Sequence, residues 1–231
     1  MAGKIYGVGV GPGDPELLTI KAVRLIERCD VIAVPGKIPE RTAAYRIARQ
    51  ACPQIEEKEL LGIDMPMTKD QDILKASHDK GAEKLKEILE TGKNVAFLTL
   101  GDPCVYSTYL YLHERLIQEG MEAELVSGIP SFCAAAARLN EGIAKKAEQI
   151  HILPASYQIE EALKLSGTKI LMKAGKRLPE VKAQLEDSGQ QVVMVENCGM
   201  EGEHIYYNIQ EIPDQAGYYT LLFVKEEGEE A

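Results

Sequence analysis

Apolar residues along the first half of the chain alternate between short continuous runs and longer segments with helical spacing. Leu18, Ala22 and Leu25, for example, are spaced to share one face of a helix. The β-prone runs are residues 4–10, 31–34, 94–100 and 125–126. The third run is almost wholly apolar, as is typical of a strand covered on both faces of a parallel sheet. Because strand, loop and helix repeat in this order, the pattern predicts a doubly wound α/β sheet.

The chain turns polar between residues 140 and 148, and we place a domain boundary there. The predicted domains are 1–140 and 148–231. The second half again alternates β-prone and helical segments, but it ends with two β-rich runs, 205–209 and 218–224, with no helical segment between them. These runs predict an antiparallel edge and hence a mixed sheet. The predicted fold class is therefore a two-domain α/β protein with a parallel, doubly wound N-terminal sheet and a mixed-sheet C-terminal α/β domain.

Composition and charge narrow the possible partners. The 231 residues include 26 basic and 36 acidic ones, for a net charge of −10, which argues against a nucleic-acid partner. The five cysteines and four histidines are scattered without C-x-x-C or H-E-x-x-H spacing, so we expect no metal site and reduced thiols. No stretch approaches the ~18 apolar residues of a membrane span, and the N-terminal apolar run is too short for a secretory signal. We therefore expect a cytoplasmic protein with no membrane partner.

The glycine-rich turn at residues 7–13 invites a dinucleotide-binding interpretation, which the spacing contradicts. Pro12 and Asp14 stand where the third glycine of G-x-G-x-x-G would be needed, and no acidic residue ends the second predicted strand. No lysine suits a phosphate loop, and Asp14 and Glu16 would repel a phosphate. These residues argue against a nicotinamide oxidoreductase. The turn predicts a close approach of the backbone to some other ligand, or else a turn that serves packing alone.

Two further loops follow predicted strands. Residues 101–107 come directly after the most apolar strand, where ligands of open parallel sheets bind. Carbonyl oxygens and the Asp102 carboxylate there suit a cationic ligand, while the alternative is Asp102 as a helix N-cap with Pro103 at the first helical position. Residues 127–131 form the third such loop. We expect the three loops to converge on one crevice.

The segments 8–19 (VGVGPGDPELLT) and 100–107 (LGDPCVYS) resemble the two signature motifs of the tetrapyrrole methyltransferases, which use S-adenosylmethionine. The similarity spans essentially the whole chain. In residues 106–112 and 218–222 it is closest to the precorrin-2 and cobalt-precorrin-2 C20-methyltransferases of cobalamin biosynthesis. The motifs fit a metal-free and a cobalt-bearing substrate equally.

The resemblance implies a homodimer with a tetrapyrrole substrate, and S-adenosylmethionine, which becomes S-adenosylhomocysteine, in a cleft between the domains. The first domain would lie on the tetrapyrrole side and the second on the adenine side. The implied cofactor-binding residues are Val10, Pro12, Gly101, Asp102, Val105, Pro130, Ser131, Met172, Cys198 and Thr220. The candidate catalytic residues are Asp102 and Tyr106, either of which, or a water, could accept a proton from the methylated carbon.

Some positions depart from the family pattern or fit a simpler role. Ser127 stands where relatives commonly have proline, and Cys198 replaces a small residue. Met172 and Thr220 also suit ordinary core positions in strands. The alternatives that stay open are a methyltransferase of the same family acting on another corrin intermediate, and a non-catalytic α/β nucleotide-binding module.

A tetrapyrrole substrate with many carboxylates would need a local basic cluster on this acidic protein. The candidates lie in or beside loops; they are Lys37, Arg41, Arg46, Lys145, Lys146, Lys176 and Arg177.

Overall fold

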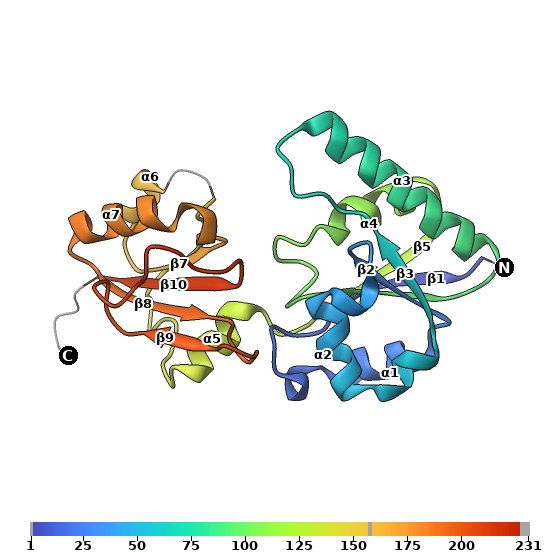
Figure 1. Ribbon diagram of the computed structural model, residues 1–231, viewed down its shortest axis with the longest axis horizontal. Coiled ribbons are helices and arrows are strands. Elements are labelled where there is room, and N and C mark those ends of the chain that lie inside the picture. The colour runs from blue at the N-terminus through green and yellow to red at the C-terminus, as the bar shows by residue number, and fades with distance from the viewer. Residues whose placement is uncertain (1, 157–158, 227–231) are drawn as a thin grey trace. The chain divides into compact units, whose positions relative to one another are not determined.

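The computed structural model describes residues 2–156 and 159–226, and the chain forms two compact units, Met1–Pro130 and Ser131–Ala231 (Figure 1). Each unit is built on a five-stranded sheet, the first all parallel and the second mixed, so the predicted fold class is confirmed. We expected the boundary in the polar stretch 140–148, but the division between the units comes before it. Helix α5 (Ser131–Arg138) belongs to the second unit because it packs on strand β10 (Thr220–Lys225) of the second sheet. No helix in the described part of the chain is long and apolar enough to cross a membrane.

The first sheet has the strand order β3-β2-β4-β1-β5. Its strands are β1 (Lys4–Gly9), β2 (Val31–Pro35), β3 (Glu59–Ile63), β4 (Val95–Thr99) and β5 (Glu122–Val126). Its α-helices are α1 (Ile20–Arg28), α2 (Ala43–Ala51), α3 (Gln71–Glu90) and α4 (Tyr109–Gln118), and its short 3-10 helices are η1 (Pro15–Leu17), η2 (Pro39–Arg41) and η3 (Pro53–Glu57). Every residue of β4 is buried, as its apolar sequence predicted.

The helices cover both faces of this sheet (Figure 1). Leu85 and Leu89 of α3 and Leu112 of α4 pack with Phe97 in one buried cluster, whereas α1 and α2 lie on the other face. The connection from β1 leads across β4 to β2, and the connection from β4 leads across β1 to β5. Right-handed crossovers therefore send the chain to opposite faces after the adjacent strands β1 and β4. The carboxyl ends of these two strands form the topological switch point, where ligands of open α/β sheets bind.

The second sheet has the order β6-β7-β10-β8-β9, in which β10 runs antiparallel to both of its neighbours. The remaining elements are β6 (Ile150–Pro154), α6 (Glu160–Leu163), β7 (Thr168–Met172), η4 (Gly175–Arg177), α7 (Leu178–Ser188), β8 (Gln191–Glu196) and β9 (His204–Tyr206). The prediction that both late runs form the edge is wrong for β10, which lies at the centre. Its first five residues are all buried, so both of its faces are covered.

The edge strand β5 of the first sheet carries a partly exposed ion-pair cluster with a pH-dependent contribution to stability. Glu124 on β5 accepts hydrogen bonds from Lys21 Nζ (2.7 Å) and Lys4 Nζ (2.8 Å), and these bonds, Lys21 first, lower the pKa of Glu124 to about 2. The folded pKa lies below the unfolded one, so the stabilisation is present above about pH 4.3 and is lost as the pH falls towards 2.

We expect Glu124→Gln to lower the free energy of unfolding by about 0.5–1 kcal/mol at pH 7, because the side chain is partly exposed and such pairs are screened. The difference from wild type should shrink below pH 4 and vanish near pH 2. Urea unfolding across this range measures it. Glu122→Gln on the same strand, whose carboxylate forms no ion pair within residues 2–156 and 159–226, is the control; a difference that grows on acidification would contradict the assignment.

Candidate functional site

The three glycine-bearing loops of the first unit meet at the switch point. Gly11 and Gly101 form an isolated antiparallel bridge, in which the Gly101 N–H donates to the Gly11 carbonyl (2.8 Å) and the Gly11 N–H donates to the Gly101 carbonyl (3.3 Å). Gly128 of the third loop lies so close that a Cβ added to it would be 2.2 Å from the Gly101 oxygen. A Cβ on Gly9 would be 2.7 Å from the Gly128 nitrogen. The structure thus brings the three loops together as expected. Positions 9 and 128 require glycine because the backbone of a neighbouring loop lies where a Cβ would be.

The Asp102 carboxylate ties two of these loops to each other. Its Oδ2 accepts a hydrogen bond from the Gly128 N–H (3.0 Å), its Oδ1 accepts one from the Cys104 N–H (2.7 Å), and the residue is only 7% exposed. The alternative of a helix N-cap is wrong, because α4 begins only at Tyr109 and Tyr106 adopts a positive φ of 51°. Asp102 therefore closes a turn and anchors the neighbouring loop.

The hydrogen bonding of the turns decides which ligands they fit. The N–H groups of Gly11, Gly101, Cys104 and Gly128 all donate within the site itself. A phosphate needs such donors, whereas a cation is favoured by a carboxylate and by carbonyl oxygens. The site therefore suits a positively charged group and offers these N–H groups to no phosphate.

The other predicted residues of the first unit line these turns. Val10 and Pro12 are buried in the first loop, and Val105 is half-buried in the second. Tyr106 is 43% exposed, and its left-handed backbone is strain of the kind that concentrates at functional sites. Sequence reasoning missed Thr99, whose Oγ1 lies 2.9 Å from Ser107 Oγ and so anchors the loop that carries Tyr106. The sequence feature that could have indicated Thr99 is its hydroxyl, which stands alone at the end of an otherwise apolar strand.

Three predicted residues of the second unit gather at one edge of its sheet. Met172 ends β7 and pairs with Leu221, while Thr220 begins the antiparallel β10 and pairs with Glu196 at the end of β8. Cys198 follows β8 by two residues and is half-buried. Thr220 is 2% exposed, and its Oγ1 donates to the Gly217 carbonyl (2.8 Å). Strand ends from three neighbouring strands thus meet around this edge.

The two remaining predicted contacts lie where the chain passes from one unit to the next. Pro130 ends the first unit, Ser131 begins α5, and both are half-buried. From the other end of α5, Arg138 Nε donates to Glu203 Oε1 (2.6 Å), and Glu203 Oε2 accepts from the Gly199 N–H (2.7 Å). This pair attaches the loop that carries Cys198 to α5.

The candidate basic residues do not form one cluster. Lys37 and Arg41 lie in the loop after β2, at the same edge of the first sheet as the glycine turns, and Arg46 lies on α2. Arg177 follows β7 and pairs with Glu180 (2.6 Å). The other candidates are Lys145 and Lys146, which precede β6 and so lie at the sheet edge opposite Met172, and Lys176, whose side chain is outside the described part.

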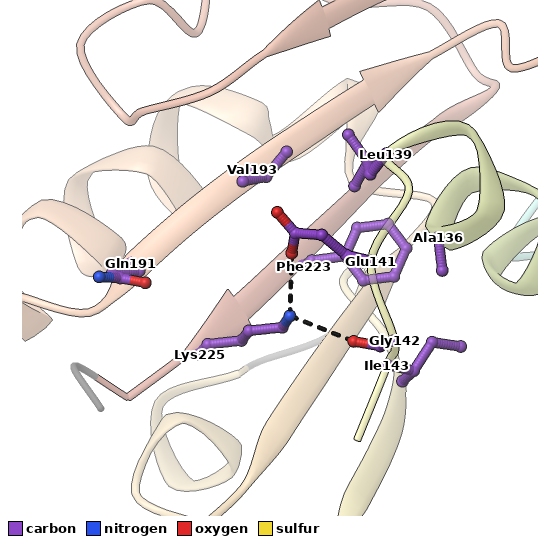
Figure 2. A pocket seen from close by; sticks show the side chains of 9 residues that line it. All are labelled: Ala136, Leu139, Glu141, Gly142, Ile143, Gln191, Val193, Phe223 and Lys225. Carbon is purple, nitrogen blue, oxygen red and sulfur yellow. Dashed lines mark hydrogen bonds and ion pairs between the residues drawn. The ribbon is translucent and has the colours of Figure 1, made fainter. Parts of the chain in front are cut away.

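A separate pocket in the second unit is lined by none of the predicted residues (Figure 2). Its walls include Leu139, Ile143, Val193 and Phe223. The Lys225 Nζ contacts Glu141 Oε2 (3.1 Å) and the Gly142 carbonyl (3.3 Å) beside them.

In the described residues, no group of three or more His, Cys, Asp or Glu side chains is placed to hold a metal ion.

Comparisons with known proteins agree on one family. The family model described as tetrapyrrole (corrin/porphyrin) methylases matches residues 4–213. A probable cobalt-precorrin-2 C(20)-methyltransferase of Methanocaldococcus jannaschii is 35% identical, with 96% of each chain covered. The cobalt-precorrin-2 C(20)-methyltransferase of Salmonella typhimurium is 29% identical over 100% of each chain.

A solved structure shows the same fold. Uroporphyrin-III C-methyl transferase from Thermus thermophilus, complexed with S-adenyl homocysteine, superposes with a TM-score of 0.74. The match covers 97% of this chain and 98% of that chain at 19% identity.

Proposed function

The chain belongs to the tetrapyrrole (corrin/porphyrin) methylase family, and from this premise we propose that it methylates carbon 20 of precorrin-2 or cobalt-precorrin-2 in cobalamin biosynthesis, with S-adenosylmethionine as methyl donor. Three relatives that match along at least 95% of their length carry this activity in their names. We further propose a cytoplasmic homodimer, as the family resemblance implies; sedimentation of the purified chain and cell fractionation test these two points.

The observation that carries the proposal is the junction of Gly11, Gly101 and Gly128 around Asp102. S-adenosylmethionine, when bound, supplies a methyl group activated on a positively charged sulfur. The junction fits such a ligand because its N–H groups are consumed internally and a carboxylate lies beside its carbonyl groups. The implied contacts Val10, Pro12 and Val105 belong to the same turns.

The chain's main contribution in this proposal is orientation. Holding a donor and an acceptor in line supplies roughly 7–11 kcal/mol of a barrier. A ring carbon of the tetrapyrrole is the nucleophile, so no serine or cysteine nucleophile is needed. Rigid turns with few degrees of freedom, closed by the Gly11–Gly101 bridge, support this role.

The roles of the two candidate catalytic residues differ in this proposal. Both Asp102 oxygens accept backbone N–H groups in a nearly buried position, which favours a positioning role over proton transfer. Tyr106, which is more exposed, or a water is then the acceptor of the proton from the methylated carbon. Met172, Cys198 and Thr220 would hold the adenine side, and their grouping at one sheet edge supports this.

The decisive experiment is anaerobic turnover with S-adenosylmethionine labelled with carbon-13 on its methyl group. We expect NMR to locate the label on carbon 20 of precorrin-2, cobalt-precorrin-2 or both. Label on another corrin intermediate alone would assign a different acceptor within the family. No transfer to any tetrapyrrole, together with no affinity for S-adenosylhomocysteine, would contradict the proposed function and favour the alternative of a non-catalytic α/β nucleotide-binding module.

A further inference from the structure

Exposed apolar side chains of the first unit concentrate at the sheet edge that holds the glycine turns. The large apolar residues with at least two-fifths of their surface exposed there are Ile20, Ile38, Met67, Ile73, Tyr106, Tyr111 and Ile117. All except Ile117 lie in the loops after the strands or within the first three residues of α1, α3 and α4. Because these helices begin at the carboxyl edge of the sheet, the apolar surface is gathered at that edge. Such a concentration marks an interaction site.

The segments that carry three of these side chains are linked at Asp64 by bonds of neighbouring residues. The Lys37 Nζ, next to Ile38, pairs with Asp64 Oδ2 (3.2 Å), and the Gly36 N–H donates to the Ile63 carbonyl (2.7 Å), so the loops after β2 and β3 run side by side. The Ser77 hydroxyl donates to the Asp64 carbonyl, one helical turn from Ile73. Met67 follows Asp64 by three residues and is 72% exposed. We call Ile38, Met67 and Ile73 the apolar rim.

Two exposed cations lie beside the apolar rim. Arg41 and Lys69 are exposed on the same two loops, and their side chains form no ion pair with any described residue. Of the acids beside them, Asp64 is paired with Lys37. The carboxylates of Glu40, Asp70 and Asp72 form no ion pair with any described residue, and Asp70 caps α3 by accepting from the Asp72 and Ile73 N–H groups. Apolar surface next to unpaired cations suits a ligand with a broad apolar face and carboxylates at its margin.

We infer that the apolar rim, with Arg41 and Lys69, binds the face and the carboxylates of the tetrapyrrole. This inference rests on the proposed function, and it assigns to the loops after β2 and β3 the selection of the acceptor, separate from the turns that hold the methyl donor. A flat macrocycle covers several side chains at once, so each rim residue contributes through buried apolar area.

The test uses Ile38→Gln/Met67→Gln in the full chain, with uroporphyrin, a stable porphyrin rich in carboxylates, as the probe. We expect its dissociation constant, measured by porphyrin fluorescence, to rise about tenfold or more, because two apolar contacts are lost. The KM for the tetrapyrrole substrate of the methyl transfer should rise in parallel, and the affinity for S-adenosylhomocysteine should stay within about twofold of wild type. Ile117→Gln is the control and should bind as wild type does, because Ile117 lies at the opposite edge and is about as exposed as Ile38 (50% against 48%).

Equal uroporphyrin binding by the double variant and wild type would overturn the inference, as would equal weakening by Ile117→Gln or no binding by the wild type itself. If uroporphyrin binding depends on the rim but no methyl transfer occurs, the inference stands and the proposed function fails. If the wild type methylates precorrin-2 and the double variant does so with an unchanged KM, the function stands and the inference fails.

Discussion

Asp102→Ala is expected to weaken binding of S-adenosylhomocysteine by about 100-fold or more and to lower the free energy of unfolding by about 1–3 kcal/mol. The substitution leaves the Gly128 and Cys104 N–H groups without their acceptor, and the cost comes mainly from Gly128, because its N–H is buried whereas Cys104 is exposed and open to water. The loops after β4 and β5 would then separate at the switch point. Isothermal titration and thermal unfolding measure the two effects.

Asp102→Asn is the matched variant, because its amide keeps one oxygen acceptor in nearly the same volume. We expect an intermediate loss, with binding weakened about tenfold. Normal ligand binding with abolished turnover in this variant would indicate that the carboxylate accepts a proton, and it would contradict the positioning role. Wild-type binding and turnover in Asp102→Ala would show that the carboxylate only stabilises its local turn and has no role in ligand binding or catalysis.

Gly128→Ala is expected to abolish measurable binding of S-adenosylhomocysteine while the secondary structure is retained. The added Cβ would lie 2.2 Å from the Gly101 oxygen and 2.8 Å from the Gly9 carbonyl carbon, and both contacts are with backbone that no rotamer change can move. Relief requires the third loop to withdraw, which also stretches its bond to Asp102. Overpacking of this kind costs about 1–3 kcal/mol or more. Titration and far-ultraviolet circular dichroism together measure the outcome.

Gly142→Ala is the control, because the nearest atom to its added Cβ is 3.8 Å away and its backbone φ is not positive. This variant should bind as wild type does and unfold within about 1 kcal/mol of it. Gly128→Ala with wild-type affinity would show that the close approach of the three loops is not needed for the ligand.

The sequence predicts the place of the site better than its internal connections. Parallel strands send their following loops to one edge, so three glycine-bearing loops after β1, β4 and β5 could be expected to converge. The bond from Gly128 to Asp102 joins residues 26 positions apart. Nothing local to either residue indicates it, and the helix-cap interpretation failed because a positive φ at Tyr106 interrupts the segment.

Two elements show where periodicity is a weak guide. The strand β3 was not predicted, because its five residues include Gly62 and only Ile63 is fully buried. The run that forms β10 was predicted as a strand, but its central position depends on pairing with β7 and β8, which a single sequence does not reveal. Likewise, α5 is assigned to the second unit by its packing on β10 and not by the polar stretch that follows it.

The internally satisfied turns have a consequence for selectivity in a cell crowded with adenine nucleotides. ATP and NADPH share the adenosine moiety with the proposed donor, but their phosphates would meet a carboxylate and amide groups that already have partners. Discrimination would then come from withholding hydrogen bonds, with no bulky side chain needed to exclude the competitors. An enzyme built in this way can keep a tight adenosine contact and still avoid inhibition by the commonest metabolites that carry it.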